Sequence, residues 1–441
     1  MFLSYAAGVC EADGNEIQLI DSPAMELDLP QTLEGIKKFN PELIICSTST
    51  PSILNDLKVV KAIKEQIGVK VAIMGTHATA EPLESMEMEP SLDFVIIGEA
   101  DYTCRNLIRS LRGDGQPLSQ IAGLAFRTED GKVDFQPEGP KIENLDEIPW
   151  VSKVYRKHLY SCYKKYFYGA NLNPLIVILT GRGCPNRCSY CVIPQTLNGH
   201  KFRMRDPKDV VDELEYIKNN FEDLGEVFFE DDTFTANHEH VRQICNLILE
   251  RNLKITWSCN ARADVPLELL QLMKKAGGRE MCVGFESASP VVLENIHKGV
   301  KNTDKAIEFT KNARKAGLLV HGCFMVGNPG DTPETLRMTL DYAKKLNPKR
   351  FCDRGLFRIV RCPNYLGEIL MWWGVGLSAF CVMPQRPYLL AGALLNTVMF
   401  LVISIPMADR RQSAKAGFAE YKKATRILLP IKKSEGSPDP Q

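Results

Sequence analysis

Short apolar runs alternate with amphipathic stretches over the first 115 residues of the chain. Each run is apolar on both faces, and the stretches between runs have apolar residues at helical spacing, as in ILNDLKVVKAIKEQ. Strands of this kind, separated by helices, are typical of a parallel sheet with helices on both faces. We therefore predict a doubly wound α/β domain over residues 1–115. Its strands are expected at residues 16–22, 42–50, 69–76 and 93–100.

Small and polar residues follow the apolar core of three of these strands. Parallel sheets bind ligands at the carboxyl ends of their strands, which makes these residues candidates for a binding site. Small residues also make tight turns from strand to helix, and the pattern leaves both interpretations open. The candidates are Ser47, Thr48, Gly75, Thr76, His77, Gly98 and Glu99.

The alternation resumes with a longer period after a connector. This connector, residues 116–170, contains an Asp-Gly hairpin signal at Asp130 and Gly131. Five strand–helix units follow within residues 171–348, which predicts a partial (β/α) barrel with its chemistry at the carboxyl ends of the strands. The segments at those ends are GRGCPNRCSYC, EDDTFT, NARAD, FESAS and GNPGDT. The strands are expected at residues 175–180, 226–232, 255–260, 280–287 and 319–327.

The character of the chain changes in its last segment, residues 349–441. Residues 365–383 and 388–406 are apolar runs, each close to the ~20 residues that span a bilayer. A basic tail follows, and the positive-inside rule places such a flank in the cytoplasm. Glu368 lies in the first run, where a carboxylate is costly, and is therefore a candidate functional residue. We predict a helical membrane hairpin; the alternative is a pair of buried helices.

Composition narrows the class of protein. Lys plus Arg and Asp plus Glu both number 54, so the net charge is zero, which argues against a nucleic-acid partner. Most of the 14 cysteines are scattered singly in apolar runs, and Cys46 and Cys282 are interpreted as small buried hydrophobes. The chain opens without the basic region of a signal peptide, so we expect the catalytic part in a reducing cytoplasm.

Three further cysteines lie within eight residues, at Cys184, Cys188 and Cys191. A zinc site normally takes four ligands in separated pairs, and a disulfide framework takes an even number of cysteines. Three thiolates fit a [4Fe–4S] cluster with one iron left open, since such clusters normally take four. A zinc knuckle is the alternative.

The spacing C-x3-C-x2-C, between a strand and a helix, resembles the radical S-adenosylmethionine superfamily. The resemblance implies that the open iron chelates S-adenosylmethionine and that one electron, from a donor such as flavodoxin or ferredoxin, breaks its C5′–S bond to give a 5′-deoxyadenosyl radical. It also implies contacts to the methionine amino group, the methionine carboxylate, the ribose and the adenine. The residues matched to these contacts are Tyr190 (adenine), Asp231 and Asp232 (amino group), Arg262 (carboxylate), Glu286 (ribose and amino group) and Gly327 (adenine-side strand).

The N-terminal domain resembles that of the cobalamin-binding radical enzymes, which include methyltransferases and ring-forming enzymes. This resemblance covers residues 1–346 and implies a cobalamin cofactor and a small-molecule or lipid-like substrate. No D-x-H-x-x-G motif is present, so no histidine is expected to ligate cobalt from below. His77 stands where this subfamily has a loop histidine, although a solvated loop residue is the alternative.

Two departures from the pattern lie at the ends of this region. The N-terminal domain starts one strand late, and the barrel has five of the six strands of the family core, which predicts an open edge beside residues 319–327. The last ~90 residues resemble the C-terminal part of steroid 5-alpha-reductase-like and isoprenylcysteine methyltransferase-like membrane proteins. That resemblance implies contacts to a nucleotide such as NADPH from Arg361, Asn364, Tyr365 and Glu368.

Three hypotheses follow. The leading one is a cobalamin-dependent radical enzyme of the methyltransferase class, anchored to the membrane at its C-terminus. The second is a membrane reductase or methyltransferase module carried by the C-terminal segment, although two spans seldom enclose a cofactor pocket. The third is a truncated or chimeric binding protein without activity, joined near residue 349.

Overall fold

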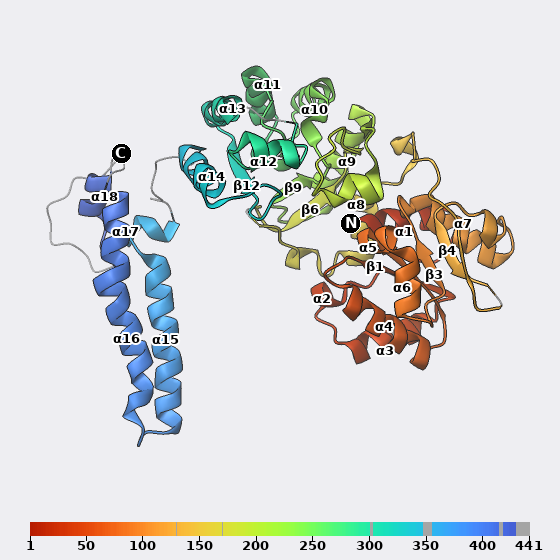
Figure 1. Cartoon of the computed structure of the whole chain (residues 1–441), viewed down its shortest axis with the longest axis horizontal. Coiled ribbons are helices and arrows are strands. Elements are labelled where there is room, and N and C mark those ends of the chain that lie inside the picture. Colours follow the sequence, from red (N-terminus) through yellow and green to blue (C-terminus); the bar gives the residue numbers. More distant parts are fainter. Residues whose placement is uncertain (129, 170, 300–302, 347–354, 414–417, 429–441) are drawn as a thin grey trace. The chain divides into compact units, whose positions relative to one another are not determined.

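The structure is a computed structural model that describes residues 1–441 except 129, 170, 300–302, 347–354, 414–417 and 429–441 (Figure 1). It separates into two compact units, Met1–Lys344 and Lys345–Gln441. Each unit is described by itself. The predicted junction near residue 349 lies outside the described residues.

The first sheet of unit 1 has five strands in the order β1-β2-β3-β4-β5. The first three are parallel, and β4 and β5 form an antiparallel hairpin that joins the sheet beside β3. The hairpin turns at Asp130 and Gly131, so part of the connector belongs to this sheet. The strands are β1 (Leu43–Thr48), β2 (Lys70–Gly75), β3 (Phe94–Ile96), β4 (Leu124–Arg127) and β5 (Val133–Phe135).

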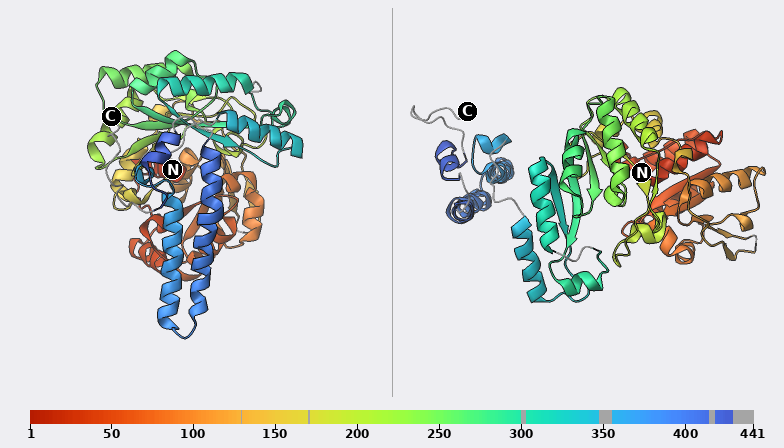
Figure 2. Two further views of the ribbon diagram at one scale, coloured as in Figure 1. Left: turned by 90° about the vertical axis from the view of Figure 1, so that its left-hand side faces the viewer. Right: turned by 90° about the horizontal axis from the view of Figure 1, so that it is seen from above.

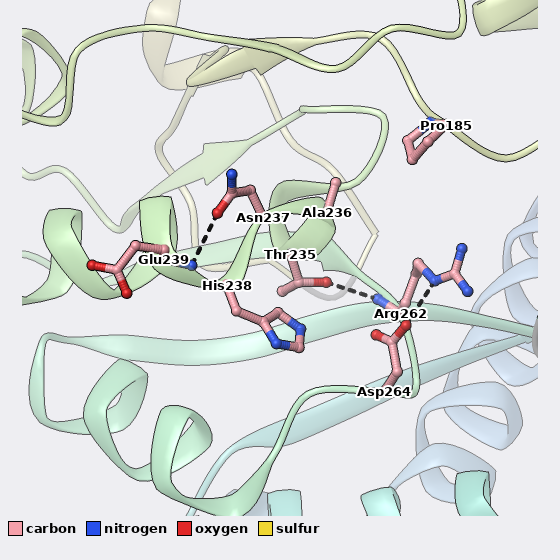
Figure 3. Close-up of a pocket in the computed structure, with 8 residues that line it drawn as sticks. All are labelled: Pro185, Thr235, Ala236, Asn237, His238, Glu239, Arg262 and Asp264. Atoms are coloured by element: carbon pink, nitrogen blue, oxygen red, sulfur yellow. Dashed lines mark hydrogen bonds and ion pairs between the residues drawn. The ribbon is translucent and has the colours of Figure 1, made fainter.

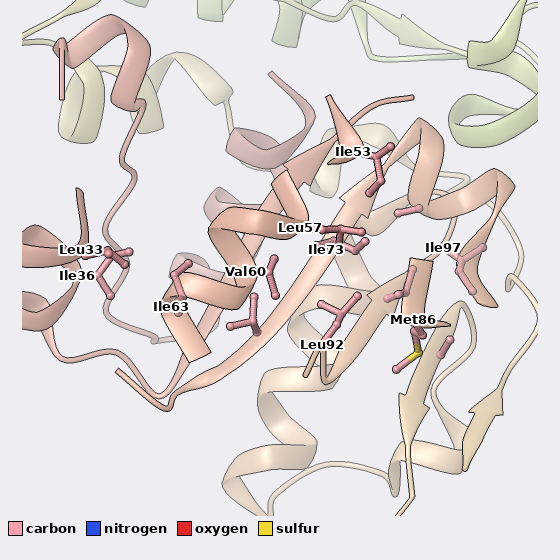
Figure 4. Close-up of a cluster of buried hydrophobic side chains, with 14 residues drawn as sticks. Leu33, Ile36, Ile53, Leu57, Val60, Ile63, Ile73, Met86, Leu92 and Ile97 are labelled. Carbon is pink, nitrogen blue, oxygen red and sulfur yellow. The ribbon is translucent and has the colours of Figure 1, made fainter. Parts of the chain in front are cut away.

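Helices cover both faces of this sheet, as predicted for a doubly wound domain. One face packs on a cluster that includes Leu33, Leu57, Val60 and Ile73 (Figure 4). The other packs on a second cluster from the remaining helices and strands. The first cluster involves α3 (Leu29–Phe39), α4 (Ile53–Gln66) and α6 (Pro82–Met88), and the second α1 (Phe2–Ala12) and α7 (Ala100–Arg112).

The strand expected at residues 16–22 is wrong. Residues 15–20 have no regular secondary structure, and the short helix α2 (Ser22–Met25) follows. Asp21 caps this helix by accepting a hydrogen bond from the backbone N–H of Ala24 at 3.2 Å, and Pro23 lies in its first turn, where proline is tolerated. Ile17 and Ile20 still pack against the two clusters, so their apolar character reflects burial without strand pairing.

The second sheet of unit 1 is a five-stranded parallel sheet in the order β12-β11-β10-β9-β6. This arrangement confirms the predicted partial barrel. Among the described residues β12 pairs only with β11, so it forms the open edge that the sequence predicts. The strands are β6 (Leu175–Ile178), β9 (Glu226–Phe229), β10 (Trp257–Ala261), β11 (Gly278–Glu286) and β12 (Leu319–Phe324).

Four long helices that follow these strands contact one another in a row on one side of the sheet (Figures 1 and 2). They are α9 (Pro207–Asn220), α10 (His238–Glu250), α11 (Leu267–Lys275) and α13 (Thr303–Ala316). The shorter α12 (Pro290–Asn295) follows β11, and α14 (Pro333–Leu346) follows β12. A two-stranded ribbon of β7 (Gly181–Arg182) and β8 (Arg203–Met204) brackets the cysteine-containing loop.

Unit 2 is a helical hairpin (Figure 2). Residues Pro363–Val382 and Pro387–Gln412 form helices long and apolar enough to cross a membrane by length and composition. Most of the apolar side chains of these two helices are exposed, which is compatible with the predicted membrane hairpin. The elements are η7 (Gly355–Arg358), α15 (Pro363–Val382), η8 (Pro387–Leu390), α16 (Ala391–Met399), η9 (Phe400–Ser404), α17 (Ile405–Gln412) and α18 (Phe418–Ala424).

Candidate functional site

The three clustered cysteines lie on a loop between β7 and β8, at the carboxyl end of β6. Backbone hydrogen bonds fix the loop: the N–H of Cys184 donates to the carbonyl of Gly199 at 3.1 Å, and that of Cys191 donates to the carbonyl of Cys188 at 3.1 Å. Gly183 has φ +95°, and a Cβ there would lie 2.1 Å from the Lys201 carbonyl oxygen. The loop therefore requires glycine immediately before its first cysteine.

The three thiols are near neighbours. The Cys184 side chain is buried and accepts a contact from Asn186 Nδ2 at 3.3 Å, while Cys188 and Cys191 are half-buried. Burial raises the pKa of the Cys191 thiol, and the charge of Asp232 adds to that rise. The described residues contain no group of three or more His, Cys, Asp or Glu side chains in the geometry of a single metal ion. A cubane cluster bonds each thiolate to a different iron, so it does not require the three thiols to converge on one metal ion.

The two carboxylates expected at the methionine amino group face the cluster loop and its supporting strand. Asp231 is fully buried and accepts hydrogen bonds from Thr180, from the backbone N–H at 2.7 Å and from the hydroxyl at 2.5 Å. Burial raises the pKa of Asp231 to about 7. Asp232 accepts from the Gly183 N–H at 2.9 Å and from Asn198 Nδ2 at 3.2 Å. Both carboxylates thus already have partners within the protein.

Tyr190 and Glu286 meet at the carboxyl end of β11. The Tyr190 hydroxyl donates to Glu286 Oε1 at 2.9 Å, and Lys298 Nζ donates to the same oxygen at 3.0 Å and to the Tyr190 oxygen at 3.2 Å. Burial, followed by the charge of Glu286, raises the pKa of Tyr190. Glu286 has φ +61°, an uncommon conformation for a residue with a side chain, as found where structure is held for function. The sequence analysis did not select Lys298, because it lies 12 residues after Glu286 and no sequence motif connects the two.

Arg262 lines a pocket that opens beside the cluster loop (Figure 3). The pocket has a volume of about 480 Å³. The Arg262 backbone N–H donates to Thr235 Oγ1 at 3.1 Å, and its side chain contacts Asn186 and, at 3.0 Å, Asp264. Arg262, which is predicted to hold the methionine carboxylate, therefore lies beside the cluster loop, and its guanidinium already pairs with Asp264. The lining residues are Pro185, Thr235, Ala236, Asn237, His238, Glu239, Arg262 and Asp264.

Gly327, expected on the adenine side, lies just beyond β12. Its backbone N–H donates to Asp331 Oδ2 at 2.9 Å, and that of Asn328 donates to the same oxygen at 2.8 Å. The segment is therefore a turn held by Asp331, which sequence reasoning did not single out. No described hydrogen bond joins Gly327 to the side chains of Tyr190 or Glu286.

His77 is the candidate at the first sheet that has an unsatisfied atom. It lies in α5 (Thr76–Ala80), directly after β2, and is buried rather than solvated. Its Nδ1 contacts Thr50 Oγ1 at 3.3 Å, while its buried Nε2 has no hydrogen-bond partner among the described residues. A buried ring nitrogen without a partner is costly unless a ligand satisfies it, which fits a cofactor at this sheet edge.

The other candidates at this edge differ in what they offer. Ser47 is exposed, whereas the Thr48 hydroxyl donates to Asp56 Oδ2 at 2.7 Å. Gly75, the last residue of β2, and Gly98, which follows β3, are buried and have positive φ, and Thr76 is half-buried. Glu99 has its carboxylate buried in ion pairs with Arg182 and Arg203. This edge of the sheet therefore combines one histidine nitrogen without a hydrogen-bond partner, His77 Nε2, with polar side chains such as Thr48 and Glu99 that already bind other residues of the chain.

The C-terminal signature residues do not converge on one point. Arg361 donates to the carbonyls of Lys422 at 3.1 Å and Thr425 at 3.0 Å and pairs with Asp409 at 3.3 Å. The Tyr365 ring stacks on Phe400 with centroids 4.8 Å apart. Asn364 and Glu368 are exposed on α15. In the described part of unit 2, Arg361 and Tyr365 contact the hairpin and its tail. The role of all four residues in holding a nucleotide stays a prediction.

Comparison with protein families assigns three regions of the chain. Residues 178–343 match the radical SAM superfamily, where SAM is S-adenosylmethionine, and residues 2–108 match the B12 binding domain. Residues 337–425 match a family described as a protein of unknown function, DUF1295, the steroid 5-alpha-reductase-like family of the C-terminal resemblance.

Relatives with curated descriptions extend this assignment. An uncharacterized methyltransferase of Pyrococcus horikoshii is 33% identical over 389 residues, covering 88% of this chain and 80% of that protein. The aligned region covers 88% of this chain, which is more than residues 1–348 together make up. The similarity to this relative therefore extends into the C-terminal segment. A cytidylyl-2-hydroxyethylphosphonate methyltransferase of Streptomyces wedmorensis is 27% identical, with 78% and 72% covered. An anaerobic magnesium-protoporphyrin IX monomethyl ester cyclase of Rubrivivax gelatinosus is 28% identical, but the chain spans only 62% of its length.

Solved structures show the same fold. The cobalamin-dependent S-adenosylmethionine radical enzyme OxsB aligns with a TM-score of 0.64 and 19% identity over 77% of this chain and 49% of that one. The radical S-adenosylmethionine methyltransferase TsrM of Kitasatospora setae aligns with a TM-score of 0.63 and 19% identity over 78% and 68%.

A B12-binding sheet followed by a radical barrel defines an enzyme class that uses S-adenosylmethionine, an iron–sulfur cluster and cobalamin. The chain belongs to the cobalamin-binding radical S-adenosylmethionine enzymes, in the methyltransferase-like branch of the Pyrococcus relative.

Proposed function

We propose that this enzyme transfers a methyl group to a carbon of a small or lipid-like molecule, after reductive cleavage of S-adenosylmethionine. The observation that carries the proposal is the meeting of two groups at the barrel: the loop of Cys184, Cys188 and Cys191, and the Tyr190–Glu286 pair at the end of β11. When bound, the cluster supplies one electron to S-adenosylmethionine, and cobalamin carries the methyl group.

The residues of this chain position the reactants. The three cysteines would hold the cluster. Glu286 Oε1 already accepts from Tyr190 and Lys298, so Glu286 would offer its other carboxylate oxygen, Oε2, to a hydroxyl or ammonium donor. Arg262 would pair with a carboxylate in the pocket of Figure 3. His77 Nε2, which is buried without a hydrogen-bond partner, would contact cobalamin at the edge of the first sheet. We assign Asp231 and Asp232 to support of the cluster loop, since their side chains already have protein donors.

The hairpin of unit 2 would anchor the enzyme to a membrane, with the catalytic unit in the cytoplasm. Arg410 and Arg411 lie in the last turn of α17, so this helix carries positive charge at its C-terminal end. A membrane anchor suits a lipid-like substrate, because such a molecule partitions into the bilayer. Flotation with liposomes tests the anchor: the full chain should float, and a chain ending at residue 344 should not.

Anaerobic reconstitution of the full chain in detergent tests the chemistry. We expect a [4Fe–4S] signal by electron paramagnetic resonance after reduction, stoichiometric corrinoid in the absorption spectrum, and 5′-deoxyadenosine after adding S-adenosylmethionine and dithionite. Cys184→Ala should lose the cluster, whereas Cys381→Ala, an exposed cysteine of α15, should keep it. Zinc in place of iron would contradict the proposal. A cluster without 5′-deoxyadenosine would favour the inactive binding protein instead.

A further inference from the structure

Glu99 carries a contact that the cofactor-binding prediction did not anticipate. It lies between β3 and α7, at the carboxyl edge of the first sheet. Its Oε1 accepts a hydrogen bond from Arg182 Nη1 at 2.8 Å, and its Oε2 accepts from Arg203 Nη1 at 2.9 Å and from the Ile142 backbone N–H at 2.8 Å. The side chain is 5% exposed, so this carboxylate is not available to a ligand from solvent.

The two arginines form the base of the cluster loop. They are paired opposite each other in the β7–β8 ribbon, with Arg182 two residues before Cys184. Arg203 Nη2 also donates to the Asn198 carbonyl at 2.8 Å, and the Asn198 amide donates to Asp232 at 3.2 Å. A continuous set of buried polar contacts therefore runs from Glu99 to the loop that carries the three cysteines.

The other side of Glu99 is tied to the segment of His77. The backbone N–H of Gly98 donates to Thr79 Oγ1 at 2.8 Å, and Thr79 and His77 belong to the same short helix, α5. Glu99 therefore stands between the edge that would receive cobalamin and the loop that would receive the cluster.

The charges in this contact balance. Arg182 also binds Asp101, at 2.6 and 3.2 Å, so two arginines face two carboxylates, all of them almost fully buried. Burial raises the pKa of the Glu99 carboxyl, but Arg182 and Arg203 outweigh burial and hold it below its usual range. Replacing a buried ion pair by apolar groups often costs little stability, so stabilising the fold does not by itself explain such a pair. Holding two segments in a fixed geometry is a second role, and this role can be tested.

We propose that Glu99 is a positioning residue that locks the cobalamin edge of the first sheet to the cluster loop and so sets the spacing of the two cofactors. This inference rests on the proposed function. Group transfer between two bound cofactors depends on their separation, and a displacement of about 1 Å can cost on the order of a hundredfold in rate.

The test compares Glu99→Gln with Glu143→Gln in the full chain. Both changes remove one carboxylate that pairs with the end of the cluster loop, but Glu143 and its partner Lys201 are exposed. Without cofactors, we expect faster hydrogen exchange in peptides over residues 95–103 and 179–186 of Glu99→Gln, and no change in Glu143→Gln. With cob(II)alamin and the one-electron-reduced cluster bound, the spin coupling between them should change in Glu99→Gln alone. After further reduction with titanium(III) citrate, transfer of the methyl group from S-adenosylmethionine to cob(I)alamin, which gives methylcobalamin and S-adenosylhomocysteine, should slow at least about tenfold in Glu99→Gln.

The outcomes separate this inference from the proposed function. A wild-type chain that takes up no corrinoid overturns the proposed function and this inference with it. A wild-type chain with both cofactors, together with Glu99→Gln of full cofactor content and unchanged spin coupling, overturns the inference alone. If Glu99→Gln does not fold, Arg182→Lys, which keeps the charge balance but loses the two-pronged contact to Glu99 and Asp101, gives the same comparison.

Discussion

Replacing Asp231 with asparagine should remove part of the pH dependence of the free energy of unfolding. Asp231 is fully buried against Thr180, and burial raises its pKa from 3.8 to about 7. The Asp231 carboxylate therefore binds a proton more tightly in the folded chain than in the unfolded chain. The contribution of the protonated Asp231 carboxyl to the free energy of unfolding is complete below the pKa of this group in the unfolded chain. It is lost as the pH rises through the pKa of this group in the folded chain.

The magnitude follows from these two values. A carboxyl that titrates at 3.8 unfolded and at about 7 folded loses about 2.5 kcal/mol of stability between pH 5 and pH 8. Asparagine has nearly the same shape, its oxygen can still accept from the Thr180 N–H, and the Thr180 hydroxyl can turn to accept from its amide. Asp231→Asn should therefore lose about 2.5 kcal/mol less than the wild type over this range.

The assay is urea-dependent hydrogen exchange of the cofactor-free chain in detergent, read by mass spectrometry on peptides covering β6 and β9. Glu230 is a necessary control, because burial also raises its pKa to about 7 and it contributes a slope of the same sign. Glu230→Gln should remove that second contribution and leave the Asp231 contribution intact. A difference between wild type and Asp231→Asn that is constant from pH 5 to pH 8 would refute the reasoning, because it would mean that Asp231 is ionised throughout.

Three further changes test other parts of the molecule. Gly75→Ala places a Cβ 2.1 Å from the Thr48 carbonyl oxygen at φ +125° and should reduce corrinoid retained on gel filtration, whereas Gly68→Ala, with φ +77° and open space, should retain it. The Sγ atoms of Cys282 and Cys323 lie 3.6 Å apart, so mild treatment with diamide should link these two first, as a cross-linked peptide that Cys282→Ser abolishes. Arg361→Ala removes the contacts to Asp409 and to two tail carbonyls and should speed trypsin cleavage of the tail in detergent; Arg386→Ala, between the two long helices, should not.

The sequence predicted the elements of both sheets because their signals are local. Strands apolar on both faces, separated by amphipathic helices, specify the two parallel sheets, and only the strand at residues 16–22 was wrong. That error has a local cause as well, since Asp21 and Pro23 start a helix where apolar residues alone suggested a strand. The pairing of β4 and β5 with the first sheet depends on contacts across more than 20 residues, which a pattern along the chain does not contain.

The candidate site was predictable to the extent that its residues are close in sequence. The spacing of Cys184, Cys188 and Cys191 by itself predicts a cluster site, and the structure places all three on one loop with Tyr190 beside the third; their role as cluster ligands stays a prediction. Lys298 and Asn186 were missed, because their partners Glu286 and Arg262 come from other strands and loops. Cys282, interpreted as a small buried hydrophobe, is only half-buried and lies against Cys323 of the neighbouring strand.

Residue type at a strand end does not distinguish a ligand from a structural support; the partners of its polar atoms do. Asp231, Asp232, Glu99 and Arg361 all have the chemistry that the family resemblance requires, yet each already has protein partners in the folded chain. A cofactor that used these atoms would first have to displace a buried hydrogen bond, which costs about as much as the new contact contributes. His77 Nε2 carries no such penalty, because it is buried without a partner. The direct contacts to cobalamin should therefore come from the segment of His77, while the acidic residue of the neighbouring loop, Glu99, sets where that segment lies relative to the cluster.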